Sequence, residues 1–143
     1  MSKQISVSRV IPVPAQKIFD LLADPKMHPV IDGSGTVRRS NPGNPERLSL
    51  GSKFSMGMVR GAPYPVTSTV SEFEEGKRIG WHHFANNVWR YELEPVDGGT
   101  KVTETFDWSG GRFGPIVRIF LRRNRPGMAK TLELIAQQVT SAR

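Results

Sequence analysis

Tyr91 and Glu104, two residues that could do acid–base chemistry, fall in neighbouring segments of alternating apolar and polar residues. Alternation puts Glu104 on an otherwise apolar wall, where a buried carboxylate is costly without a partner. The Tyr91 hydroxyl could donate a hydrogen bond to it. In an enzyme the pair could supply a base for an acidic methylene and a donor to the developing enolate oxygen. The alternative is a hydrogen-bonded pair that only orders the wall.

A second candidate pair, His28 and Asp32, lies four positions apart at the end of a short predicted helix. Two side chains at this spacing can share one helix face, although Pro29 lies between them and disturbs the local geometry. The simpler alternative is that His28 is a hydrogen-bonded surface or capping residue.

Metal and nucleotide chemistry find no support in the residue pattern. The chain has no cysteine, and adjacent strand residues His82 and His83 would point to opposite faces, which does not suit zinc. Gly33-Ser34-Gly35 lacks the later glycine and the preceding strand of a dinucleotide fingerprint. We therefore expect neither a metal nor a cofactor.

The hydrophobic pattern predicts the elements that position these candidates. Turn residues separate seven predicted strands, at residues 4–13, 36–40, 52–59, 65–73, 78–84, 88–94 and 101–108. Two short helices follow the first strand, at residues 14–23 and, after an N-cap at Asp24, up to residue 31. A long helix is predicted at residues 115–140, with a kink at Pro126-Gly127.

This order of elements predicts one α+β domain over residues 1–143, a curved antiparallel sheet with its helices on one face. The last helix has an apolar stripe of Met128, Leu132, Ile135 and Val139. The concave face of the sheet is the surface large enough to bury that stripe. A space between them is a candidate ligand cavity.

The turn at Asp97-Gly98 predicts the register of the last hairpin. If Val96 pairs with Gly99, Tyr91 faces Glu104 on the inner side of the sheet, with Leu93 opposite Val102 and Trp89 opposite Phe106. The outer side would pair Glu94 with Lys101, Glu92 with Thr103 and Arg90 with Thr105.

Aromatic and methionine side chains dominate the predicted inner wall, as is typical of sites for flat or flexible apolar ligands. The predicted ligand-binding residues are Phe54, Met56, Met58, Trp81, His83, Trp89, Tyr91, Glu104, Phe106, Trp108 and Met128. Each of them could instead be an ordinary core residue.

The positive charge is concentrated in one segment. The 143 residues include 20 Lys and Arg against 13 Asp and Glu, a formal net charge of +7. No acidic residue lies between Trp108 and Leu132, where Arg118, Arg122 and Arg125 recur at helical spacing. This stripe could contact an anionic membrane, or it could be an ordinary solvated helix face. Nucleic acid is the less favoured partner, because no base-stacking aromatic residues are interleaved.

The expected compartment follows from three absences. The chain has no apolar run of the roughly 20 residues that cross a bilayer, no secretory signal and no cysteine. We expect a cytoplasmic monomer or homodimer.

Three stretches of the chain resemble a known superfamily. They are residues 22–25 with His28-Pro29, residues 31–37, and residues 89–95 with 99–104. Their sequences are LADP with HP, IDGSGTV, and WRYELEP with GTKVTE. They resemble the SRPBCC (START-like) superfamily, and more narrowly its polyketide cyclase/dehydrase and lipid-transport family of actinobacterial type.

The resemblance covers residues 5–139 and implies a helix-grip fold, in which the long C-terminal helix closes a deep hydrophobic cavity. Members include lipid carriers, binders of plant hormones and secondary metabolites, and aromatase/cyclases that fold polyketide chains. The family has no single catalytic signature that can be transferred residue by residue.

The leading hypothesis is therefore the binding, carriage or sequestration of a hydrophobic small molecule such as a lipid, polyketide or isoprenoid. The alternative is a polyketide aromatase/cyclase or dehydratase, with Glu104, Tyr91, His28 and Asp32 as catalytic candidates. A third hypothesis is anionic-membrane or nucleic-acid binding through the basic C-terminal helix.

Overall fold

Seven strands form one antiparallel sheet in the order β1-β7-β6-β5-β4-β3-β2 in the computed structural model, which describes residues 4–82, 87–109 and 116–141. The strands are β1 (Gln4–Ile11), β2 (Val37–Ser40), β3 (Lys53–Arg60), β4 (Ala62–Glu74), β5 (Arg78–His82), β6 (Val88–Val96) and β7 (Gly99–Asp107). From β2 to β7 each strand lies beside the next along the chain, whereas β1 pairs with β7. The predicted α+β fold is confirmed.

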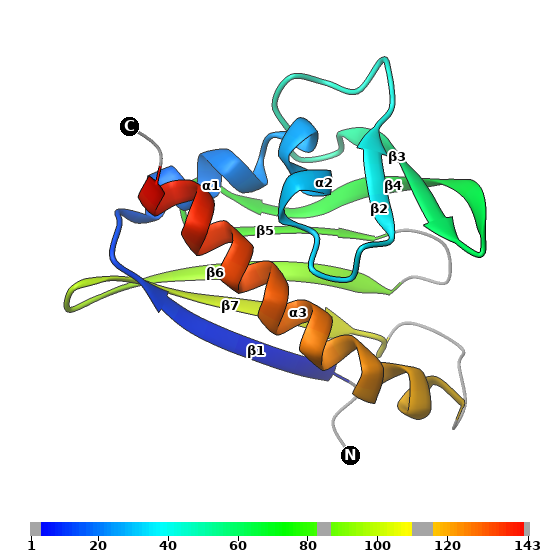
Figure 1. The fold of residues 1–143 in the computed structure, drawn as a ribbon. Coiled ribbons are helices and arrows are strands. Elements are labelled where there is room, and N and C mark those ends of the chain that lie inside the picture. The colour runs from blue at the N-terminus through cyan, green and yellow to red at the C-terminus, as the bar shows by residue number, and fades with distance from the viewer. Residues whose placement is uncertain (1–3, 83–86, 110–115, 142–143) are drawn as a thin grey trace.

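The helices cover one face of this sheet (Figure 1). They are α1 (Ala15–Leu22), the 3₁₀ turn η1 (Pro25–Met27), α2 (His28–Ile31) and α3 (Ile116–Ser141). The helix predicted to end at residue 31 is thus split in two. Asp24 caps η1 by accepting a hydrogen bond from Lys26 N at 3.0 Å. Pro126 lies inside one continuous α3 and does not end it.

β4 begins earlier than the predicted strand, which started at residue 65. Pro63 pairs with Val59 and Pro65 pairs with Gly57. In the described part of the chain, β4 pairs with β5 only from Thr69 onward. Prolines are tolerated in this stretch because the N–H that each lacks is not needed for a ladder with β5.

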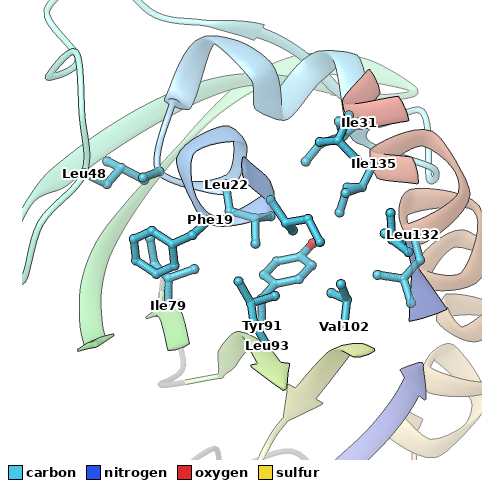
Figure 2. Packing of buried hydrophobic residues seen from close by; sticks show 14 of the residues in the cluster. Phe19, Leu22, Ile31, Leu48, Ile79, Tyr91, Leu93, Val102, Leu132 and Ile135 are labelled. Atoms are coloured by element: carbon cyan, nitrogen blue, oxygen red, sulfur yellow. The ribbon is translucent and has the colours of Figure 1, made fainter. Parts of the chain in front are cut away.

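The core lies between the sheet and the helices, as Figure 2 shows. From α1 the fully buried residues are Ile18, Phe19 and Leu22. From α3 the predicted stripe is confirmed, because Met128, Leu132, Ile135 and Val139 are all buried. Tyr91 lies among these apolar side chains, with its hydroxyl on the side of Ile31 and Ile135 (Figure 2).

The loop after α2 is fixed directly onto α3. Gly33 N donates to Thr131 Oγ1 at 2.8 Å, and Thr131 Oγ1 donates to the Gly127 carbonyl at 3.0 Å. A Cβ atom at Gly33 would overlap the Gly127 carbonyl oxygen and lie 2.5 Å from Thr131 N. Glycine is therefore required at position 33.

Candidate functional site

The β6–β7 hairpin places Tyr91 beside Glu104 on the inner face of the sheet. The predicted register is confirmed: Val96 pairs with Gly99, and Tyr91 pairs with Glu104. Glu104 is 3% exposed and Tyr91 is 5% exposed. The hairpin therefore holds a carboxyl group and a phenol together inside the protein.

Burial controls the protonation of this pair. Loss of solvation raises the pKa of Glu104 from 4.5 to about 8, while a hydrogen bond from Tyr91 lowers it and the charge of Asp32 raises it further. Burial and the charge of Glu104 also hold the pKa of Tyr91 well above its usual value. Glu104 Oε1 has no hydrogen-bond partner in the described structure. At neutral pH the pair therefore presents a protonated carboxyl with one unpartnered oxygen.

Glu104 lies where two apolar clusters meet. Its inner-face neighbours along β7 are Val102 and Phe106, of which Val102 belongs to the main cluster and Phe106 to a smaller one with Ile5 and Met128. Tyr91 belongs to the main cluster, whereas the next inward residue on β6, Trp89, packs against the smaller one. The carboxyl group thus interrupts the apolar packing beneath α3.

His28 belongs to the aromatic wall of the site. Its ring stacks on Trp81 with centroids 4.9 Å apart and meets the Phe54 ring edge-on at 5.4 Å. His28 Nε2 donates to the Leu22 carbonyl at 2.8 Å. Burial lowers the pKa of His28, so the ring is neutral at neutral pH. A surface position for His28 is wrong, because the aromatic side chains enclose the ring. The alternative of a hydrogen-bonded capping residue agrees with the structure, since the ring bonds to the carbonyl of the last residue of α1.

Asp32 has a separate role from His28. Its carboxylate accepts hydrogen bonds from Ser34 N, Ser34 Oγ and Val37 N, at 3.2, 2.8 and 2.9 Å. These bonds order the loop that packs on α3. The structure shows no direct His28–Asp32 hydrogen bond among the described residues, and Asp32 acts on the site through its charge, which raises the pKa of Glu104.

The other predicted wall residues form two groups. Phe54 and Met56 are buried in the main cluster, and Met58 and Trp81 pack against it. The smaller cluster holds the remaining described members, Phe106 and Met128 with Trp89 and Trp108 packed against them. His83 lies outside the described residues.

Asn87 is a buried polar residue that the sequence interpretation missed. It is 8% exposed, and its Oδ1 has no hydrogen-bond partner in the described structure. Extending the alternation of Tyr91 and Trp89 back by two residues would have placed Asn87 on the inner face. Residues 84–87 could form loops of different lengths, so the sequence left the start of this alternation open.

The outer face of the sheet carries a network of ion pairs rather than isolated solvated charges. Arg90 makes two hydrogen bonds of 2.6 Å to Glu72, and its Nη1 lies 3.5 Å from Asp107 Oδ2. Arg78 Nη2 lies 2.8 Å from Glu92 Oε2 in the same network. These pairs link β4, β5, β6 and β7 on the side opposite to Glu104.

Of the three arginines in the predicted basic stripe of α3, the structure describes the side chain of Arg125. The side chains of Arg118 and Arg122 lie outside the described residues, while Arg125 is exposed and donates to the Ser6 carbonyl at 3.4 Å. In the part of the chain that the structure describes, no helix has the length and apolarity to cross a membrane. Within the same ranges, no three His, Asp or Glu side chains are grouped to hold a metal ion.

Comparison with known proteins places this fold and sequence in a family. A curated relative, "Uncharacterized protein Rv0088" of Mycobacterium tuberculosis, is 36% identical over 149 residues that cover 98% of this chain and 66% of the relative. This chain thus spans slightly less than two thirds of that relative's length.

Solved structures share the fold at low sequence identity. Protein MLL2253 of Mesorhizobium loti superposes with a TM-score of 0.75 at 17% identity, covering 98% of each chain. The Aha1 dimer of Colwellia psychrerythraea gives a TM-score of 0.70 at 14% identity, again covering 98% of each chain. A family model described as "Polyketide cyclase / dehydrase and lipid transport" matches residues 2–140. The chain therefore belongs to the polyketide cyclase/dehydrase and lipid transport family and has its helix-grip fold.

Proposed function

We propose that this protein binds a hydrophobic small molecule, such as a lipid, polyketide or isoprenoid, between the inner face of the sheet and α3. The observation that carries the proposal is the position of Glu104, whose unpartnered oxygen lies where two apolar clusters meet. A buried polar atom without a partner is costly, and a bound molecule can supply the missing hydrogen bond. Family membership supports the same function.

The side chains around Glu104 suit an apolar ligand. Trp89 and Phe106 have ring centroids 4.4 Å apart, and Trp81 and Tyr91 have centroids 5.7 Å apart. Aromatic faces offer a large contact area to a flat ligand, and Met128 on α3 can adapt its shape to the opposite side. The ligand would thus lie along the two aromatic pairs with Glu104 between them.

Native mass spectrometry of the purified protein tests this proposal. A co-purifying apolar compound, or a rise in the melting temperature with an added fatty acid, isoprenoid alcohol or aromatic ketone, is the expected result. Absence of any bound compound, together with an unchanged melting temperature across this set, would overturn the proposal.

Matched variants locate the site. Trp89→Ala removes aromatic area from the inner face and should weaken binding of whichever compound is found. Glu94→Ala changes an exposed residue of the same strand and should leave binding unchanged. Equal loss in both variants would show that the compound does not lie beneath α3.

A second candidate function is cyclase or dehydratase chemistry in the same site. The specific observation in its favour is the pKa of Glu104, about 8, because a general acid or base works best when its pKa is near the operating pH. The ionised fraction of Glu104 would accept a proton from the acidic methylene of a poly-β-ketone. The Tyr91 hydroxyl, no longer held by a carboxylate, would then donate a hydrogen bond to the enolate oxygen.

Turnover of a poly-β-ketone substrate by wild type tests this second function. Glu104→Gln and Tyr91→Phe should abolish turnover while preserving binding of the substrate. Turnover that persists in both variants would remove these residues from the mechanism.

A further inference from the structure

The Glu104 carboxyl has two oxygens in different situations. Tyr91 hydrogen-bonds to the carboxyl group, yet Oε1 has no partner in the described structure. On the neighbouring strands, the residues paired with Glu104 are Tyr91 on β6 and Val7 on β1. Val7 is apolar and offers no hydrogen bond from its side chain.

The protonation state decides what Oε1 can offer. With a pKa of about 8 the group is a carboxylic acid at neutral pH, so it has one O–H donor and one acceptor oxygen. The Tyr91 hydroxyl, whose pKa is also raised, stays protonated and can donate a hydrogen bond to Glu104. We assign the bond as one from the Tyr91 hydroxyl to the carbonyl oxygen of the acid, which leaves the acid proton on Oε1, the oxygen without a partner.

We propose that Oε1 of Glu104 donates a hydrogen bond to a carbonyl oxygen of the ligand, so that the site selects neutral, flat carbonyl compounds over hydrocarbons of the same shape. This inference rests on the proposed binding function and names the ligand class that the same site prefers. It does not require any reaction.

The charged groups around the site favour a neutral ligand. Among the described residues, the charged groups that act on Glu104 are Asp32, beyond α2, and the carboxyl's own partner Tyr91 if it ionises. The buried residues in this part of α3, Met128, Thr131 and Leu132, are uncharged. A carboxylate ligand would meet negative charge from Asp32 without a compensating cation from the residues that the structure describes. An amine would instead favour ionised Glu104, which makes it an informative competitor.

Two probes of matched shape test the proposal, 2-acetylnaphthalene and 2-ethylnaphthalene. Their affinities are measured by quenching of tryptophan fluorescence near neutral pH. In wild type the ketone should bind about tenfold more tightly than the hydrocarbon, which is the effect of one buried hydrogen bond. Its carbonyl stretching band, followed by isotope-edited infrared spectroscopy, should move to lower frequency on binding.

Three variants identify the donor. Glu104→Leu should bind both naphthalenes equally, because it keeps the apolar site and lacks the donor. Glu104→Gln should retain the preference for the ketone through its amide N–H. Glu92→Leu, the same change on the outer face of the adjacent strand, should behave as wild type. If Glu104→Leu fails to fold, the pH dependence below provides the test without it.

The pH dependence of ketone binding distinguishes the Glu104 acid of wild type from the amide of Glu104→Gln. Ketone affinity of wild type should fall as the pH passes about 8, since ionised Glu104 has no proton to donate, whereas Glu104→Gln should show no such fall. Equal affinity of wild type for the two probes, tighter binding of 2-(aminomethyl)naphthalene than of the ketone, or a ketone preference that survives in Glu104→Leu would each overturn the inference. Failure of both naphthalenes to bind wild type would instead overturn the proposed function on which it rests.

Discussion

Replacing Glu104 by Gln should make the stability of this protein much less dependent on pH. Glu104 is a carboxylic acid in the folded state over a pH range in which it is ionised in the unfolded chain, because burial raises its pKa from 4.5 to about 8. Between these two values the folded state holds a proton that the unfolded state has released. The free energy of unfolding of wild type therefore falls as the pH rises through this interval.

The size of the effect follows from the two pKa values. Each pKa unit corresponds to about 1.36 kcal/mol, so a rise from 4.5 to about 8 lowers the free energy of unfolding by about 5 kcal/mol above that interval. At pH 7 the loss is about 3 kcal/mol by the same arithmetic. The amide that Glu104→Gln introduces does not ionise, so the variant lacks this loss. The difference between the two proteins should be small in mild acid and should grow steadily toward alkaline pH.

Urea unfolding followed by tryptophan fluorescence measures the effect at several values from about pH 5 to about pH 9. Glu94→Gln, at an exposed position of the neighbouring strand, is the matched control and should follow wild type. Curves of stability against pH that run parallel for wild type and Glu104→Gln would refute the assignment of a raised pKa to Glu104. Equal denaturant slopes in the three proteins ensure that the midpoints compare stability alone.

Two substitutions and one titration test other parts of the structure. Gly33→Ala should lower the free energy of unfolding by about 1–3 kcal/mol, because the added Cβ overlaps the Gly127 carbonyl. Gly127→Ala is the control and should cause no such loss, since its Cβ would lie 3.5 Å from the Ser34 Cα. Equal urea midpoints for the two variants would contradict the prediction. Arg90→Ala should lower the free energy of unfolding by about 1–3 kcal/mol in the same assay, because it leaves half-buried Glu72 without its main partner. The control is Lys77→Ala, which removes the exposed ion pair of Lys77 with Glu74. A loss in Arg90→Ala no larger than in this control would contradict the prediction. Followed by NMR, the His28 ring should titrate below pH 6.5, because burial lowers its pKa. The free energy of unfolding should therefore fall as the pH drops below that value, since the unfolded chain then takes up a proton that the folded state does not. A titration midpoint above 6.5 would contradict the lowered pKa.

Local patterns were enough to predict the sheet and the register of its last hairpin. The Asp97-Gly98 turn leaves two residues between Val96 and Gly99, and this short loop aligns every pair from there to Trp89 and Phe106. A slip by one residue would have placed Glu92 and Arg90 inside, at a large cost in burial of charge. The inward position of Glu104 therefore followed from the sequence.

Contacts between distant segments could not be predicted in this way. The packing of Gly33 on α3 depends on where the loop after α2 meets the helix, and a glycine in a loop resembles any other turn glycine in the sequence. The enclosure of His28 by Phe54 and Trp81 depends on three elements that meet in space. The two hydrogen bonds from Arg90 to Glu72 span β5 and bypass the pairing of neighbours that a hairpin register predicts.

The pairing of β1 with β7 has a consequence for how the chain folds during synthesis. Ile5 pairs with Phe106, so about 100 further residues must be synthesised before β1 can pair. At ordinary rates of translation this takes about 5–20 s. During that time the strands from β2 onward can pair with their sequence neighbours as each one emerges, because their connections are local. β1 must remain unpaired until β7 has left the ribosome, and α3 follows later still. We expect the final closure of the sheet by β1 to be the slow step of folding and the stage most exposed to aggregation.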